Sequence, residues 1–310
     1  MSKVFHILGC TACGKASVGR ELAKRLGGSI LSVDSMKIYR RMNIGTATPS
    51  EEAQKEVPFY GIDLVEPSES FSVARYVECA EQAIRDIRAA GSVPLAVGGT
   101  ALYIQSLVWG LFDTPSSDPA VRDAIVAEAS DRGWLSMHDE LREIDPQAAD
   151  RIHVNDERRI VRALEVYRTT GQPISHHQQQ WNADEPNPRA VLIGLRREKE
   201  DQSRRINSRV RAMVDAGLVA EVEQLLAETK PLSKQAGQAV GYAELISHFE
   251  NPSACSLEKA VEQIKINTRR LAKKQRTWFR RWARVQWFDL QPDDSVAGVT
   301  DRIMEAIDFD

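Results

Sequence analysis

Residues 4–26 read VFHILGCTACGKASVGRELAKRL, and this stretch determines the fold prediction. A short, mostly apolar run at residues 4–8 predicts a buried strand, and residues 15–26 predict a helix. The turn between them, with Lys15, matches G-x-x-x-x-G-K, the phosphate-binding P-loop, in the strand–loop–helix context that this motif requires. We therefore expect the loop amides and the Lys15 ammonium to bind a phosphate at the helix N-terminus.

The residue after Lys15 departs from this motif. A P-loop continues with Ser or Thr, whose hydroxyl is a ligand of Mg²⁺. Here position 16 is Ala, and Ser17 lies one residue further on, rotated by about 100° around the helix. The missing ligand disfavours an ordinary ATPase.

Outward from the loop, further strands are predicted at residues 29–33, 93–97, 189–195 and 285–290. The strands at 29–33 and 93–97 are followed by Asp34-Ser35 and by Gly98-Gly99-Thr100, respectively. Parallel sheets place their ligands at the carboxyl ends of strands. Charged helical segments are predicted at 118–132, 136–144, 146–151, 156–170, 199–227 and 257–282.

The fold class that follows is α/β, with a P-loop NTPase-like parallel sheet flanked by helices and a helical insertion domain. Residues 1–116 and 188–310 are predicted to form the core with its C-terminal basic helix, and residues 117–187 the insertion.

The composition is that of a globular chain: 310 residues, 42% of them hydrophobic and 27% charged. Residues 91–112 contain no charged side chain, but Pro94 and the Gly98-Gly99 pair break this run, so we expect a strand, a turn and a helix rather than a membrane span. The N-terminus has no secretory signal pattern, and we expect a cytoplasmic protein.

Charge is distributed unevenly along the chain. The formal net charge is −3, yet residues 264–284 contain nine basic residues and no acid. A helix over this segment aligns one stripe, predicted to face the core, and leaves the cations mostly on the other faces. The stripe consists of Ile264, Thr268, Leu271, Gln275, Trp278 and Trp282. Cations without compensating acids indicate contact with a nucleic acid.

Cys10 and Cys13 form a C-x-x-C pair. A redox dithiol or half of a zinc site is the alternative interpretation, but no second Cys or Cys/His pair is spaced to complete a zinc site. The pair lies inside the phosphate loop, and we favour that role. The six histidines show no ligand spacing.

Seven segments in series resemble the tRNA dimethylallyltransferase (IPP transferase) family in order and spacing, over nearly the whole chain. They are VDSMKIY at 33–39, NIGTA at 43–47, VGGTALY at 97–103, DPAVR at 118–122, NDERRIVRALEV at 155–166, QAVGY at 238–242 and NTRRLAKKQRTWF at 267–279. The resemblance implies transfer of a dimethylallyl group from its diphosphate to N6 of the adenosine 3′ of a tRNA anticodon.

The resemblance and the residues together predict the site. Asp34 is the candidate general base for the poorly nucleophilic amine, and Lys15 and Thr100 are the other catalytic candidates. The predicted diphosphate-binding residues are Gly9, Cys10, Thr11, Ala12, Cys13, Gly14, Lys15, Ala16 and Ser17. The predicted tRNA-binding residues are Asp34, Ser35, Met36, Lys37, Thr100, Arg122, Arg158, Arg159, Ile160, Val161, Arg162, Gln238, Lys265, Arg269, Arg270, Lys273 and Arg276.

Mg²⁺ is the expected cofactor, held mainly through diphosphate and water. The expected partners are the tRNA anticodon stem-loop and dimethylallyl diphosphate. We expect a monomer that does not bind a membrane. The chain departs from the family pattern at Cys10, Cys13, Ala16 and Lys37, where the family usually has Pro, Ser, Thr or Ser, and Gln.

Three other functions remain alternatives. An adenylate isopentenyltransferase would use free AMP or ATP and would not need the insertion or the basic run. A P-loop kinase or RNA-dependent ATPase fits poorly with Ala16. A noncatalytic RNA-binding module would leave Lys15, Asp34 and Thr100 without a role.

Overall fold

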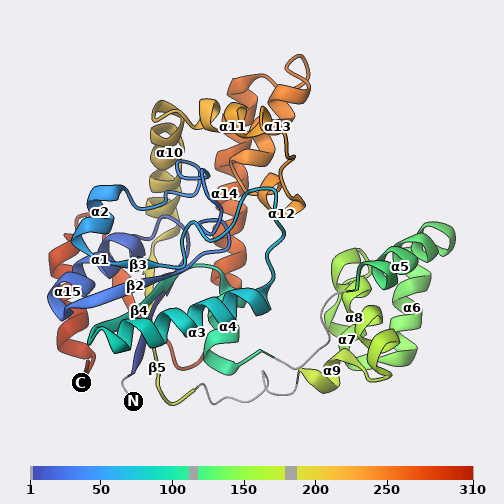
Figure 1. Cartoon of the computed structure of the whole chain (residues 1–310), viewed down its shortest axis with the longest axis horizontal. Coiled ribbons are helices and arrows are strands. Elements are labelled where there is room, and N and C mark those ends of the chain that lie inside the picture. Colours follow the sequence, from blue (N-terminus) through green and yellow to red (C-terminus); the bar gives the residue numbers. More distant parts are fainter. Residues whose placement is uncertain (1–2, 112–117, 179–186, 310) are drawn as a thin grey trace. The chain divides into compact units, whose positions relative to one another are not determined.

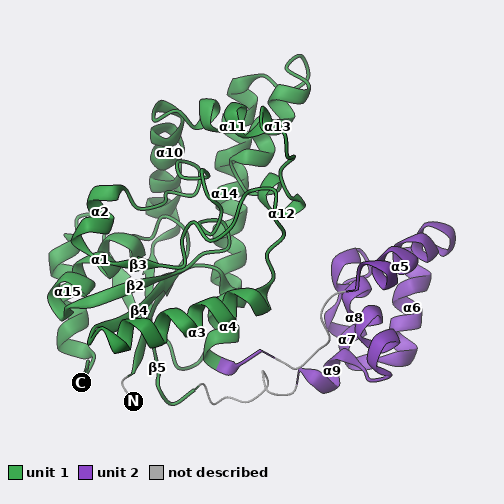
Figure 2. Ribbon diagram, in the orientation of Figure 1, with its two compact units in different colours: residues 1–108, 187–310 green, residues 109–186 purple. Residues whose placement is uncertain are grey.

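The computed structural model describes residues 3–111, 118–178 and 187–309. The chain divides into two compact units (Figure 2): unit 1 comprises Met1–Val108 with Asn187–Asp310, and unit 2 comprises Trp109–Pro186. The predicted domain boundary between residues 116 and 117 lies outside the described residues.

Unit 1 is built on a six-stranded parallel sheet with the order β3-β2-β4-β1-β5-β6 (Figure 1). Its strands are β1 Val4–Gly9, β2 Gly28–Val33, β3 Phe59–Tyr60, β4 Val93–Gly98, β5 Ala190–Arg197 and β6 Gln286–Leu290. Ile7 of β1 is paired with Val97 of β4 and Ile193 of β5, so the P-loop strand is central and buried. The predicted parallel α/β core is confirmed. The two-residue β3 was not predicted, because so short a strand has no recognisable period.

The helices of unit 1 pack on the sheet or on one another. They are α1 Lys15–Leu26, α2 Glu51–Glu56, α3 Val73–Ala89, α4 Ala101–Trp109 (whose last residue belongs to unit 2), α10 Lys199–Asp215, α11 Leu218–Leu226, α12 Lys234–Gly237, α13 Tyr242–Glu250, α14 Leu257–Phe279 and α15 Val296–Ala306. One hydrophobic cluster joins β1, β4 and β5 to α1 and α15, with Leu22, Ile193 and Ile303 fully buried.

Two helix predictions in unit 1 were wrong. The single helix expected over 199–227 is broken between α10 and α11 by Gly217, whose φ of 100° favours glycine and lies outside helical geometry. Helix α14 ends at Phe279, before Trp282.

Unit 2 contains only helices in its described part: α5 Pro119–Arg132, α6 Trp134–Ile144, α7 Pro146–Arg151, α8 Glu157–Thr170 and α9 Ile174–His177. The first four match the four predicted segments closely. Asp118 and Asp156 cap α5 and α8 by accepting backbone N–H groups, as Asp does at helix N-termini. A separate core, including Ile125, Leu141 and Leu164, holds these helices together.

Within the described ranges, the chain has no helix with the length and apolar character needed to span a bilayer. Residues 93–98 form β4 and residues 101–109 form α4, which agrees with the predicted strand, turn and helix; Pro94 lies within β4.

Candidate active site

A cavity of about 530 Å³ lies in unit 1 where the P-loop and the carboxyl ends of β2 and β4 meet α10 and α14. Lys15, Asp34 and Thr100 all line it. These three predicted catalytic residues come from three separate segments of the chain, and the sheet brings them to the same cavity. They approach one another because parallel strands carry their C-terminal loops to the same edge.

Two glycines shape the P-loop. At Gly9, a Cβ would lie 2.5 Å from the carbonyl oxygen of Leu195, which only glycine avoids. Gly14 has φ 104° at the N-cap of α1, a backbone conformation that favours glycine.

The carbonyl groups of the P-loop are held by side chains. Lys15 Nζ donates to the Cys10 oxygen at 3.2 Å, Gln202 Nε2 to the Thr11 oxygen at 2.9 Å, and Arg197 Nε to the Cys13 oxygen at 3.0 Å. In a planar trans peptide, the carbonyl and the following N–H point in opposite directions. These contacts therefore fix the orientation of the loop amides.

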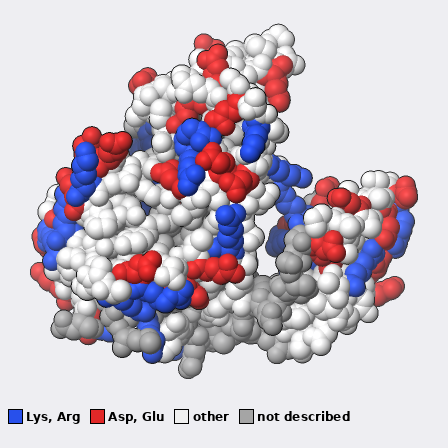
Figure 3. Space-filling view, in the orientation of Figure 1, with Lys and Arg blue, Asp and Glu red and all other residues white. Residues whose placement is uncertain are grey.

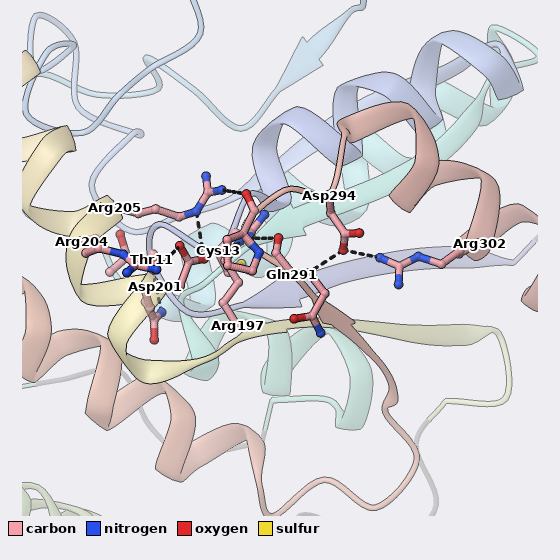
Figure 4. Close-up of polar contacts among 11 residues, drawn as sticks. Thr11, Cys13, Arg197, Asp201, Arg204, Arg205, Gln291, Asp294 and Arg302 are labelled. Atoms are coloured by element: carbon pink, nitrogen blue, oxygen red, sulfur yellow. Dashed lines mark hydrogen bonds and ion pairs between the residues drawn. The ribbon is translucent and has the colours of Figure 1, made fainter.

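Arg197 is the centre of a polar network beneath the loop (Figure 4). Its side chain is only 5% exposed, pairs with Asp201 at 3.1 Å, and also donates to the Gln291 carbonyl at 2.6 Å. Arg205 binds the same carboxylate at 3.1 Å. Burial raises the pKa of Asp201, but Arg205 and Arg197 together lower it by more. The pKa of this carboxyl therefore lies below its ordinary value. The network connects β5, α10 and the segment after β6 to the P-loop.

We expect Arg197→Leu to lower the free energy of unfolding by about 2 kcal/mol, because the Cys13 and Gln291 carbonyls lose a buried donor. Arg204→Leu is the matched control: Arg204 binds the same Asp201 at 3.6 Å from a side chain that is 69% exposed, and its loss should change stability by less than about 0.5 kcal/mol. Urea denaturation measures both. Equal effects in the two variants would contradict a supporting role for Arg197.

Asp34 follows β2 directly and is half-buried. Its Oδ1 accepts the Met36 N–H at 2.9 Å and the Lys37 N–H at 3.4 Å, so the turn orients the carboxylate. Thr100 Oγ1 accepts the Ser35 N–H at 3.0 Å, which ties the two strand ends together. The Asp34 carboxylate and the Thr100 hydroxyl both line the cavity, the first as a hydrogen-bond acceptor and the second as a group that can donate or accept.

Sequence reasoning missed several residues of this cavity, among them Arg209 and Gln275. Arg209 of α10 lines it, with Nη1 3.5 Å from Thr11 Oγ1. The pKa of Arg209 lies below its ordinary value, because burial lowers it by more than the nearby Asp34 carboxylate raises it. Gln275 accepts the Thr11 N–H at 2.8 Å and donates to the Gly99 carbonyl at 2.8 Å, joining the two glycine-rich loops. Neither residue carries a local motif; only the packing of α10 and α14 places it.

The interpretation of the stripe as core was wrong for most of its residues, although Ile264 and Trp282 are buried. Ile264, Thr268, Leu271, Gln275 and Trp278 line the cavity, and Leu271 and Trp278 are each 38% exposed. A helical stripe at this spacing packs against something, but the sequence does not say whether that is core or a cavity. These five residues of α14 form part of the cavity wall.

The cations of α14 fall into two groups. Lys265 pairs with Glu262 at 2.5 Å, Arg269 donates to Asn207 at 2.6 Å, and Arg276 donates to Gln202. Arg270 and Lys273 are exposed, although Arg270 also donates to Asn267 Oδ1 at 3.1 Å. The structure brings Arg276 to the P-loop support rather than to the surface.

A second wall is formed by Gly45, Thr46 and Ala47, in the segment at residues 43–47. The carboxylate of Glu221 accepts the N–H groups of Asn43, Ile44 and Gly45 at 2.9, 2.8 and 3.1 Å, and the hydroxyl of Tyr242 at 2.6 Å. Tyr242 is fully buried against Gly45, where a Cβ would lie 2.4 Å from its ring. Gln238, predicted to contact tRNA, lines the same cavity with Ser35, Met36 and Lys37.

The predicted tRNA-binding residues of unit 2 are distributed over α5 and α8. Arg122 and Arg162 bind the buried carboxylate of Glu165 at 3.0 and 2.7 Å, and Arg159 pairs with Asp156. Arg158 is exposed. Ile160 and Val161 lie in the hydrophobic core of unit 2, so their side chains are not available to a nucleic acid in this structure.

Ala16 lines the cavity, whereas Ser17 is exposed and is absent from its lining. The described residues contain no group of three or more His, Cys, Asp or Glu side chains that could hold a metal ion. Cys10 and Cys13 are free and buried, and burial raises the pKa of the Cys10 thiol. A protonated, enclosed thiol fits a packing role in the loop.

Comparison with known proteins gives a consistent result. The sequence profile described as IPP transferase matches residues 37–282. The chain is 46% identical over 290 residues to a tRNA dimethylallyltransferase from Bacillus licheniformis, covering 93% of this chain and 91% of that one. It is similar to the crystal structure of a tRNA isopentenylpyrophosphate transferase from Bacillus halodurans, with 37% identity, a TM-score of 0.69 and coverage of 98% and 96%. It is also similar to a eukaryotic dimethylallyltransferase acting on tRNA, with 25% identity, a TM-score of 0.77 and coverage of 93% and 74%.

Proposed function

The chain belongs to the tRNA dimethylallyltransferase (IPP transferase) family, and on this premise we propose that it alkylates N6 of the adenosine 3′ of the anticodon, with dimethylallyl diphosphate as donor. The observation that carries this assignment is the convergence of Lys15, Asp34 and Thr100 on one cavity beside a P-loop. We propose further that it acts in the cytoplasm as a monomer.

The reaction forms one bond and breaks another. As the N6 lone pair attacks the allylic carbon, the bond from that carbon to the diphosphate oxygen breaks and diphosphate leaves. The N6 proton passes to the Asp34 carboxylate, while the Thr100 hydroxyl orients the amine. The P-loop amides, Lys15 and Arg209 stabilise the negative charge that develops on the leaving oxygen.

Mg²⁺ fits this site mainly through the substrate. Among the described residues that line the cavity, Asp34 is the only carboxylate, and Ala16 offers no hydroxyl. An ion bound here would be held by diphosphate oxygens and water, which suits Mg²⁺ because it keeps several waters. It would supply additional positive charge to the leaving group.

The nucleic acid reaches this cavity as an unpaired loop base. An amine that must meet a donor inside a cavity has to leave the base stack, at a cost of a few kcal/mol for an unpaired base. On the face shown in Figure 3, basic and acidic side chains lie close together in mixed groups. The exposed cations of α14 differ, because the helix has no acid after Glu262.

We expect the double variant Arg270→Glu/Lys273→Glu to weaken stem-loop binding and to flatten its salt dependence, by about 0.9 in the log–log slope for each phosphate that the helix no longer neutralises. Both side chains are exposed, so the fold should be unaffected. The control is Lys55→Glu/Lys230→Glu, which changes the net charge equally at exposed positions outside α14. Equal slopes for the two double variants would remove α14 from the tRNA-binding surface.

The assignment is tested by incubating the protein with radiolabelled dimethylallyl diphosphate and either an anticodon stem-loop or AMP. We expect label in the stem-loop and one diphosphate released for each label incorporated. Preferential labelling of AMP would instead identify an adenylate isopentenyltransferase.

A further inference from the structure

The cavity carries an excess of positive charge. Among the described residues that line it, four are cationic and one is anionic. These residues are Lys15, Lys37, Arg209 and Lys274, and the carboxylate of Asp34. One carboxylate cannot neutralise four cations, so the cavity as built has an imbalance that an anionic ligand corrects.

Lys37 is one of three cavity cations that the P-loop motif does not account for. It follows the Asp34 turn and lines the same cavity as Lys15 and Arg209. The pKa of Lys37 is lowered to about 8, mainly by burial; the nearby Asp34 carboxylate opposes this shift, and the positive charges of Lys15 and Arg209 add to it. The three cations therefore interact with one another around a shared space, and that space adjoins the P-loop, since Arg209 Nη1 lies 3.5 Å from Thr11 Oγ1.

The same cavity lacks the usual metal ligand. The P-loop hydroxyl that coordinates Mg²⁺ is replaced by Ala16, and Ser17 does not line the cavity. Compared with the family pattern, which usually has Thr or Ser at position 16 and Gln at position 37, this chain has one metal ligand fewer and one ammonium group more in the same cavity. Both changes act on the same quantity, the positive charge available to a bound diphosphate.

On the premise of the proposed function, we propose that Lys37 binds the diphosphate together with Lys15 and Arg209, so that diphosphate binding depends only weakly on Mg²⁺. The ammonium of Lys37 donates to a non-bridging oxygen and supplies part of the charge that a directly coordinated ion supplies in other P-loops. It stays bound as the allyl carbon leaves, so it interacts with donor and product alike.

Titration calorimetry with inorganic diphosphate tests this directly, without tRNA or transfer. Wild type, Lys37→Met, Lys37→Arg and Ala16→Thr are each titrated in EDTA and in saturating Mg²⁺, with Lys55→Met as an exposed lysine control outside the cavity. We expect wild type to bind diphosphate in EDTA with a Kd within about tenfold of its value in Mg²⁺. Lys37→Met should weaken binding in EDTA by about tenfold or more, and by less in Mg²⁺, while Lys37→Arg and Lys55→Met stay near wild type. Ala16→Thr should gain affinity only in Mg²⁺.

Two results would overturn the proposal: binding by Lys37→Met in EDTA that equals wild type, or wild-type binding that disappears without Mg²⁺. Thermal melting of each variant shows whether it is folded, and Lys37→Arg retains the charge if Lys37→Met is unstable. If wild type binds diphosphate neither in EDTA nor in Mg²⁺, the proposed function itself is contradicted. This outcome differs from the two results that overturn the proposal for Lys37.

Discussion

Asp34→Asn is expected to lower the rate of dimethylallyl transfer by about 10² to 10⁴, the range for loss of a general base, while diphosphate and stem-loop binding persist. The asparagine oxygen can still accept the N–H groups of Met36 and Lys37, so the turn survives and only the proton acceptor is removed. Single-turnover rates with saturating stem-loop measure the effect.

The control for this variant is Asp63→Asn, which removes a half-buried carboxylate that does not line the cavity. Its rate should equal that of wild type. Transfer by Asp34→Asn within about threefold of wild type would show that another group accepts the proton.

Glu221→Ala is expected to lower the free energy of unfolding by about 3 kcal/mol, because three backbone N–H groups and the Tyr242 hydroxyl lose one shared acceptor. Since Gly45 and Tyr242 line the cavity, the KM for the stem-loop should also rise. Denaturation and steady-state kinetics measure the two effects.

Glu223→Ala is the matched control on the same helix, because Glu223 is exposed and its loss should change stability by no more than about 0.5 kcal/mol. If the two variants were equally stable, the Glu221 carboxylate would not hold the cavity wall.

The sequence predicted the parts of the site that follow strands. The P-loop, Asp34 and Thr100 each follow a strand that the hydrophobic pattern identifies, and in a parallel sheet such positions converge without further information. The fold class followed from the same pattern.

The opposite walls could not be predicted, for a physical reason. Arg209, Glu221 and Gln275 sit on helices, where periodicity identifies an apolar face but not what that face meets. The stripe on α14 shows the consequence: Leu271 and Trp278 have core spacing, yet they face the cavity. In the same way, charge counting treated Arg269 and Arg276 as surface cations, whereas Asn207 and Gln202 of α10 bind them.

The most direct test of the account is nucleoside analysis of a stem-loop after incubation with radiolabelled dimethylallyl diphosphate, beside a matched stem-loop with purine riboside in place of the adenosine 3′ of the anticodon. Purine riboside stacks as adenosine does but has no N6 amine. We predict that all label is recovered as N6-dimethylallyladenosine from the first stem-loop and that the second remains unlabelled. Equal labelling of the two stem-loops would contradict alkylation of that amine.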